Sequence, residues 1–275
     1  MTRLLMCEPR YYGVEYEINP WMNVRRPVDR ERVEKQWKAL YDLLTLKLGA
    51  SVELVPQTKG LPDQVFTANA GLVDGNRAVV SNFRYPQRAK EQPLFETWFK
   101  DHGFTVLTLP GVEHFEGEGD AFIHGGMIFA GHPFRSDAAS HKSLSQLLGK
   151  PVVSLELADP WFYHLDTCLC ILGEGKAMYY PPAFAEGSRL AIESHFPECI
   201  ALKEEEARLF ACNSIVLGGN IVMNTGCDEA KRSLQEMGFA VHETATSEFI
   251  KAGGSTKCMA LFLARKPGPG RRQFL

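Results

Sequence analysis

The sequence lacks any apolar run that approaches the roughly 20 residues needed to span a bilayer. Its opening stretch, MTRLLMCEPR, has too few apolar residues before Glu8 and Pro9 for a secretory signal. A basic stripe is also missing, because the formal charge is −3 and the one cationic cluster is KPGPGRR near residue 270. We therefore expect a cytoplasmic protein whose partner is neither a membrane nor a nucleic acid.

Cysteine pairs with metal-binding spacing are absent as well. The seven cysteines are odd in number and scattered, and no CxxC pair is matched by a second one. This pattern argues against a disulfide framework and a structural zinc site, so we expect no metal and no cofactor. No linker or low-complexity stretch interrupts the chain, which predicts one domain over residues 1–275.

What the sequence does contain is a repeat. Five polar residues each precede an apolar strand that turns at Gly, Asn or Asp and returns as a second strand: Asn69, Asp120, Asp166, Asn213 and Cys258. Consecutive members are 45 to 51 residues apart, a spacing typical of repeat architectures. Because each residue holds the same place in its unit, rotation of the units about a common axis would bring all five towards one central cavity.

An amphipathic helix and a further apolar strand follow each hairpin. In residues 30–49, Val33, Trp37, Leu40 and Leu44 recur at helical spacing, and an apolar strand begins at residue 51. The same order recurs in residues 90–110, 138–157, 188–203 and 228–245. The predicted fold class is α/β: a five-bladed α/β propeller of ββαβ repeats, closed by the N-terminal strand RLLMCEP. An open α/β sandwich with helices on both faces is the alternative, since it has the same alternation.

Cys258 is the candidate nucleophile among the five. A thiol needs a nearby base, a cation, or the positive charge of its substrate to ionise near neutral pH. In a predicted strand, His164 and Asp166 point to the same face, so an imidazole for proton transfer and a carboxylate for a cation would share one cavity. Each of these residues taken alone is more often a core feature, and the repeat is what favours chemistry.

Three carboxylates, Glu116, Glu118 and Asp120, lie among two glycines in HFEGEGDAF. Such a set can bind a cation or orient a histidine, and like-charge crowding can raise one pKa enough for acid–base work. An exposed acidic turn or half of a metal site are the alternatives. A site of hard oxygen ligands would need further carboxylates at the other repeat positions, where an amide and a thiol stand instead.

Amides and arginines supply further candidate binding groups. Asn69 either caps a turn or points into the cavity, where its amide both donates and accepts hydrogen bonds. Arg84 and Arg88 follow the first hairpin, and an arginine fork suits bidentate capture of a carboxylate, although surface arginines are common there. Cys168 and Cys170 stand beside apolar residues and are expected to fill the core.

The motifs FTAN, FEGEGD, HLDTCLC and GGSTKC, in this order and at this period, resemble the guanidine-modifying superfamily over essentially the whole chain. This superfamily includes arginine deiminase, dimethylarginine dimethylaminohydrolase, arginine:glycine amidinotransferase and arginine dihydrolase. The resemblance implies a five-bladed α/β propeller of ββαβ units with its active site on the pseudo-fivefold axis. It also implies a small-molecule substrate, arginine or a derivative, and it leaves a homo-oligomer open.

The resemblance also implies roles for individual residues. Cys258 would attack the guanidinium carbon, His164 would shuttle protons, and Glu116, with Glu118 as the alternative, would grip the guanidinium and partner the histidine. Substrate contacts are further implied for Asn69, Asp120, Asp166, Arg88 and Asn213. Arg88 would hold the α-carboxylate, and Asn19 or Asn23 would lie near the amino end.

FTAN resembles the arginine dihydrolase branch, whereas typical deiminases resemble FTRD at this place. The first expectation is therefore an arginine dihydrolase that yields ornithine, carbon dioxide and two ammonia through a covalent thiouronium. A one-step deiminase or dimethylargininase that releases citrulline is the alternative. An amidinotransferase and a non-catalytic binding protein with the same propeller are the other readings.

Overall fold

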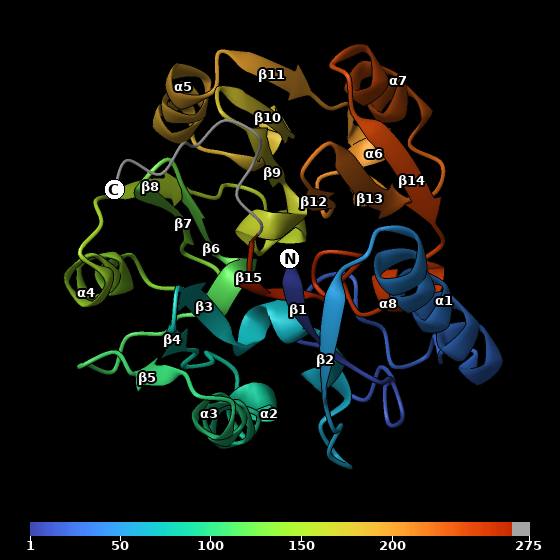
Figure 1. Ribbon diagram of the computed structural model, residues 1–275, viewed down its shortest axis with the longest axis vertical. Helices are drawn as coiled ribbons and strands as arrows, with labels where there is room; N and C mark the ends of the chain where they lie inside the picture. The colour runs from blue at the N-terminus through green and yellow to red at the C-terminus, as the bar shows by residue number, and fades with distance from the viewer. Residues whose placement is uncertain (266–275) are drawn as a thin grey trace.

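The computed structural model describes residues 1–265. Five three-stranded sheets surround a central axis like the blades of a propeller, and helices pack on their outer sides (Figure 1). This arrangement confirms the predicted five-bladed α/β propeller and excludes the open sandwich. No helix within residues 1–265 is both long and apolar enough to cross a membrane.

Each complete blade follows the predicted order of strand, strand, helix and strand. In every blade the first two strands pair antiparallel, and the second and third pair parallel. The first of these blades contains β3 (Gly71–Asp74), β4 (Arg77–Val80), α3 (Gln92–Asp101) and β5 (Thr105–Leu107). The second contains β6 (Ala121–His124), β7 (Met127–His132), α4 (Ala138–Leu148) and β8 (Val152–Glu156).

The next two blades repeat this arrangement. One contains β9 (Leu169–Gly173), β10 (Lys176–Tyr179), α5 (Glu186–His195) and β11 (Glu198–Ala201). The other contains β12 (Ile215–Leu217), β13 (Asn220–Asn224), α7 (Asp228–Glu236) and β14 (Ala240–Thr244). Short helices connect the larger elements: α2 (Pro86–Ala89), α6 (Glu204–Arg208) and α8 (Ser247–Ile250).

The fifth blade joins the two ends of the described chain. Its sheet combines β15 (Leu261–Ala264), β1 (Arg3–Cys7) and β2 (Ser51–Val55), with α1 (Arg30–Asp42) outside it. Strand β1 pairs antiparallel with β15 and parallel with β2, as the first two strands and the third strand do in every other blade. The expected closure of the ring by the N-terminal strand is therefore confirmed.

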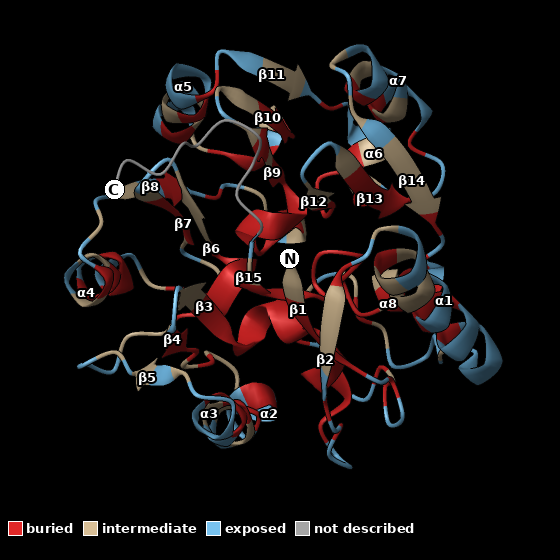
Figure 2. Ribbon diagram, viewed as in Figure 1, coloured by how far each residue is buried: buried red, intermediate tan, exposed pale blue. Residues whose placement is uncertain are grey.

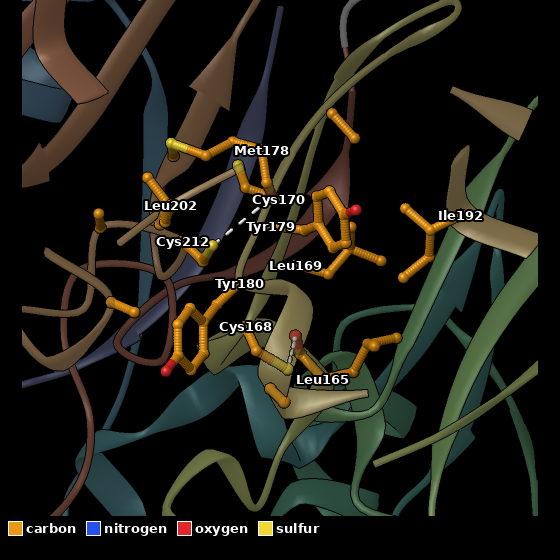
Figure 3. Close-up of a cluster of buried hydrophobic side chains, with 14 of the residues drawn as sticks. Leu165, Cys168, Leu169, Cys170, Met178, Tyr179, Tyr180, Ile192, Leu202 and Cys212 are labelled. Carbon is orange, nitrogen blue, oxygen red and sulfur yellow. Dashed lines mark hydrogen bonds between the residues drawn. The ribbon is translucent and has the colours of Figure 1, made fainter. Parts of the chain in front are cut away.

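Buried residues gather around the axis, while the outer helices turn an exposed face to solvent (Figure 2). Helix α1 shows why: Val33, Trp37 and Leu40 are buried on one face, and the Asp29 side chain caps the helix by accepting from the Arg32 amide. Cys168 and Cys170 lie in the core beside β9 together with Cys212 (Figure 3). Burial raises the pKa of all three thiols. The predicted place of Cys168 and Cys170 in the core is confirmed by this buried cluster.

Candidate active site

The site is built from short turns that precede the first strand of each blade. Asn69 lies in a 3₁₀ turn, η3 (Thr67–Ala70), Asp120 follows η4 (Gly117–Gly119), and Asp166 lies in η6 (Leu165–Thr167). The prediction that His164 and Asp166 belong to one strand is wrong, because β9 begins only at Leu169. The 3₁₀ turns bend the chain across the axis instead and carry the polar side chains inward.

Cys258 lies three residues before β15 and is 2% exposed. Its thiol donates to Asp166 Oδ2 at 3.3 Å, and Asn213 Nδ2 donates to the sulfur at 3.1 Å. The backbone amide of Cys258 donates to Asn213 Oδ1 at 3.1 Å, so one amide side chain holds both the sulfur and the backbone of the cysteine. The cysteine is therefore fixed in place before any substrate binds.

The surroundings of Cys258 keep its thiol protonated. Burial raises the pKa of this thiol well above its ordinary value, and the negative charge of Asp166 raises it further. A cation bound beside the two groups would act in the opposite direction, because it stabilises both the thiolate and the carboxylate. The arrangement therefore suits a nucleophile that is activated by a positively charged substrate.

His164 has Glu116 as its partner. Its Nε2 lies 2.8 Å from Glu116 Oε2, and Arg135 Nη1 donates to the same oxygen at 3.0 Å. Burial alone would raise the pKa of Glu116, but the charge of Arg135 and the contact with His164 outweigh burial and hold that pKa below its ordinary range. Glu116 is thus a permanent carboxylate that can orient an imidazole and stabilise its protonated form.

Asn69 stands between this pair and a second arginine. Its Nδ2 donates to the Glu116 carbonyl at 3.1 Å, and its Oδ1 accepts from Arg88 Nη1 at 2.8 Å. Within residues 1–265, one side-chain hydrogen of Asn69 has no partner. The space for the amide depends on a neighbouring glycine, since a Cβ on Gly119 would lie 2.2 Å from Asn69 Nδ2.

Two buried carboxylates near these groups have an oxygen without a hydrogen-bond partner among the described residues: Asp166 Oδ1 and Asp63 Oδ1. Burial raises the pKa of Asp166 to about 6, and it raises the pKa of Asp63 as well. A buried acceptor without a partner is costly, and a ligand that donates N–H groups removes the cost. The Asp166 oxygen is therefore ready to receive a cationic donor, whereas the Tyr16 hydroxyl lies close enough to Asp63 to lower the pKa of that carboxyl.

The segment 8–29 lies over the site and is fastened at several points. Arg135 Nη2 donates to the Ile18 carbonyl at 3.0 Å, and Trp21 Nε1 donates to the Trp161 carbonyl at 2.7 Å. Asn19 Nδ2 donates to the Ala252 carbonyl beside the Gly253 turn, whereas Asn23 is engaged in a local turn with Arg25. Of the two asparagines, Asn19 is the one near the cluster.

A family model described as N,N dimethylarginine dimethylhydrolase, eukaryotic, matches residues 17–265. The chain belongs to this family. Its sequence is 46% identical to the bifunctional arginine dihydrolase/ornithine cyclodeaminase ArgZ of Synechocystis, over 94% of this chain and 37% of that protein. It is 39% identical to an N(G),N(G)-dimethylarginine dimethylaminohydrolase of Mycobacterium tuberculosis, over 94% of this chain and 85% of that protein.

Solved structures agree with this family assignment. The N-terminal domain of ArgZ bound to product superposes with a TM-score of 0.91 and 45% identity, over 96% of this chain and 98% of that domain. A further structure of that domain, covalently bound to a reaction intermediate, has a TM-score of 0.92 at 44% identity. These findings confirm the resemblance to the guanidine-modifying superfamily. The chain spans 37% of the length of the bifunctional relatives that it matches.

Within this family fold, the structure separates the two candidate glutamates. Glu116 contacts His164, whereas Glu118 faces away, accepting from Lys257 Nζ at 2.9 Å and from the Phe262 amide at 3.1 Å. The prediction of a substrate contact from Glu118, and the alternative that it partners the histidine, are therefore wrong. The sequence could not decide this point, because the direction of each carboxylate depends on the backbone of the glycines around it.

Three other predicted substrate contacts are side chains with protein partners. Asp120 accepts from the Leu165 amide through Oδ1 and from the Ser136 hydroxyl through Oδ2, so it ties the turn that follows His164 to the segment before α4. Asn213 holds Cys258, as described above. Arg88 is 2% exposed and donates to both oxygens of Glu91, to Asn69 and to the Asp63 carbonyl. Among the described residues, one of its five N–H hydrogens is left without a partner, so in this geometry Arg88 offers a substrate carboxylate a single hydrogen bond, and its role in holding the α-carboxylate stays a prediction.

Arg135 and Asp63 were missed in the sequence. Arg135 is 3% exposed and lies between the rings of Tyr85 and Tyr163, 4.7 and 4.5 Å from their centroids. Its signal was present, because it follows the second strand of its unit much as Arg84 does one unit earlier. Asp63 lies outside the repeat positions, and nothing in its sequence context distinguishes it from a surface carboxylate.

Proposed function

We propose that this protein is a cysteine-dependent hydrolase of the guanidinium C–N bonds of arginine, acting as an arginine dihydrolase. The observations that carry the proposal are the buried Cys258 thiol hydrogen-bonded to Asp166, which has an oxygen without a partner among the described residues, and the buried His164–Glu116 pair. A planar cation with several N–H donors satisfies the free carboxylate oxygen and offers the thiolate an electrophilic carbon.

The proposed reaction has two rounds. Cys258 sulfur bonds to the guanidinium carbon, His164 gives a proton to the departing ammonia, and water activated by His164 breaks the C–S bond of the thiouronium. In the second round Cys258 attacks the ureido carbon and ammonia leaves, and water then breaks the C–S bond of the resulting thiocarbamate to release N-carboxyornithine, which loses carbon dioxide to give ornithine. Together, arginine and two waters become ornithine, carbon dioxide and two ammonia. Glu116 stabilises the protonated imidazole that each round requires.

Asn69 supports the second round. Its remaining N–H can donate to the oxygen of a ureido group, whereas an ionised carboxylate at this place would repel that oxygen. The similarity to ArgZ supports the same assignment, since that relative is named an arginine dihydrolase. A one-round dimethylargininase is the second candidate, favoured by the family description and by the relative from Mycobacterium tuberculosis.

Product analysis tests the proposal. The purified protein is incubated with arginine, dimethylarginine, agmatine and citrulline, and ammonia, dimethylamine, citrulline and ornithine are quantified. We expect two ammonia and one ornithine per arginine without added acceptor, and no turnover by the Cys258→Ser variant. Citrulline that accumulates with one ammonia would contradict the dihydrolase assignment, dimethylamine as the preferred product would support the second candidate, and a need for added glycine or ornithine would indicate an amidinotransferase.

A further inference from the structure

A buried ion pair lies directly behind the candidate nucleophile and has no part in the reaction as proposed. Lys257 precedes Cys258 in the chain, but the two side chains point to opposite sides. Lys257 Nζ donates to Glu118 Oε2 at 2.9 Å and to the Ala260 carbonyl at 3.1 Å, while the Cys258 sulfur meets Asp166. Lys257 and Glu118 are each 4% exposed.

The pair is fixed from several directions. Glu118 Oε2 also accepts from the backbone amide of Phe262 in β15, and Arg265 lies 3.8 Å from the other carboxylate oxygen. Lys257 also lines a cavity of about 90 Å³ on the side away from Cys258, beside β6 and β9. Burying two charges is costly, and a buried ion pair often adds little to the stability of a protein. Because the Lys257–Glu118 pair lies next to Cys258 in the chain, we look for its role in the reaction and not in stability.

We propose that Lys257 is a positioning residue for the reaction, whose fixed positive charge keeps Asp166 ionised and able to hold both the Cys258 thiol and a cationic substrate, with Glu118 limiting that effect. The inference rests on the proposed function, because it assigns Asp166 to the binding of a cation. Lys257 itself does not touch the substrate in this account.

The electrostatics of Asp166 agree with the proposal. Burial raises the pKa of this carboxyl to about 6, Lys257 is the largest influence that lowers it, and Glu118 raises it. Among residues 1–265, the other titratable groups that interact with Asp166 are neutral or weakly acidic: Cys258, Tyr163, Cys168 and Cys170. The lysine and the glutamate are therefore the charges that decide at which pH Asp166 becomes a carboxylate.

Opposite substitutions should shift the pH profile in opposite directions. In Lys257→Met, Asp166 is harder to ionise. The acid limb of the pH profile of kcat/KM, where activity rises as Asp166 ionises, should therefore move to higher pH by about one unit or more. In Glu118→Gln, the amide oxygen still accepts from Lys257 but the negative charge is gone, so the acid limb should move to lower pH. Lys257→Arg keeps the positive charge and should retain the wild-type limb.

A double variant that combines Lys257→Met with Glu118→Gln keeps the test valid if Lys257→Met alone does not fold. Breaking a buried pair leaves one charge uncompensated, whereas removing both charges is better tolerated. Because Lys257 has the larger influence on Asp166, the double variant should show an acid limb moved to higher pH by less than in Lys257→Met. Lower melting temperatures with unmoved acid limbs would mean that the pair is only structural and would overturn the proposal.

A direct titration separates this proposal from the proposed function. The ¹³C shift of the Asp166 carboxyl, assigned with an Asp166→Asn variant, is followed against pH in each protein without substrate. If the wild type fails to hydrolyse guanidino compounds, the proposed function fails, yet the carboxyl titration still reads the effect of Lys257. Midpoints that do not move, or that move the same way in Lys257→Met and Glu118→Gln, would overturn the role of Lys257 whatever the activity.

Discussion

Among single residues, Asn69 is the one whose amide, in the proposed function, separates one round of hydrolysis from two. Its amide links the Glu116 carbonyl to Arg88 and keeps one N–H free. A carboxylate in its place could still accept from Arg88 but would lose both donors. The local charge would also become more negative, next to a carboxylate that already carries the His164 contact.

We therefore predict that Asn69→Asp raises the ratio of citrulline to ornithine at least tenfold, because the loss of one donor and the added repulsion together cost the bound ureido oxygen about 1.4 kcal/mol or more. Amino acid analysis of arginine digests measures the ratio. Asn220→Asp, on the outer part of its blade where the side chain contacts His242, serves as the matched control. An unchanged ratio in Asn69→Asp would count against the role given to this amide.

At the same scale, the sequence predicts the nucleophile better than its partners. The positions of Cys258, Asp166 and Asn69 follow from the repeat, because each blade delivers the same position to the axis. Arg135 follows the second strand of its unit as Arg84 does, but its contact with Glu116 depends on long-range packing, and no local pattern marks Asp63. Glu116 and Glu118 were inseparable in sequence, since two residues on a tight turn can point to opposite sides.

At the scale of elements, the five helix-and-strand units follow from periodicity, but the 3₁₀ turns that carry the site do not. Such turns are only three or four residues long, and they have too few positions to show a hydrophobic period. A strand is consequently the sequence prediction for His164 and Asp166, and the contacts of His164 with Glu116 and of Asp166 with Cys258 arise from a different backbone path. The turn η4 is the clearest case, because Gly117 precedes Glu118 with a φ of 61°.

Gly117→Ala should disrupt this turn. A Cβ at Gly117 would lie 2.8 Å from the Ala68 carbonyl oxygen and from backbone atoms of Gly71, and the positive φ adds strain. We predict a loss of about 1 to 3 kcal/mol in the free energy of unfolding and at least about a tenfold loss of activity, because Glu116 and Asn69 shift together. Thermal denaturation and steady-state kinetics measure both.

Gly219→Ala is the matched control for that substitution. A Cβ at Gly219 would meet no atom within 4 Å, and its φ lies outside the left-handed region. This variant should keep both stability and activity close to those of the wild type. If Gly117→Ala behaves as Gly219→Ala does, the conformation of η4 is not what positions Glu116.

For the whole molecule, the closed ring has a testable consequence. Four blades begin with a continuous hairpin, whereas the fifth makes its equivalent pair from the two ends of the described chain, with Arg3 opposite Ala264. The break in the chain thus falls at the hairpin turn of one blade. In a ring of equivalent blades, moving the break to another hairpin should leave the structure unchanged.

We predict that a circular permutant folds and retains activity. A short Gly–Ser linker joins residue 265 to residue 2, and the new ends are placed between Gly125 and Gly126, an exposed two-residue turn between β6 and β7. The linear protein ending at residue 265 is the control, and circular dichroism, thermal melting and the ornithine assay compare the two.

In the permutant, β6 and β7 pair without a covalent turn, as β15 and β1 already do in the described chain. The loss in the free energy of unfolding should therefore stay within about 3 kcal/mol, which is the size expected for closing one loop. A permutant that cannot fold, beside a stable control, would show that the fifth blade depends on its free ends and is not equivalent to the other four.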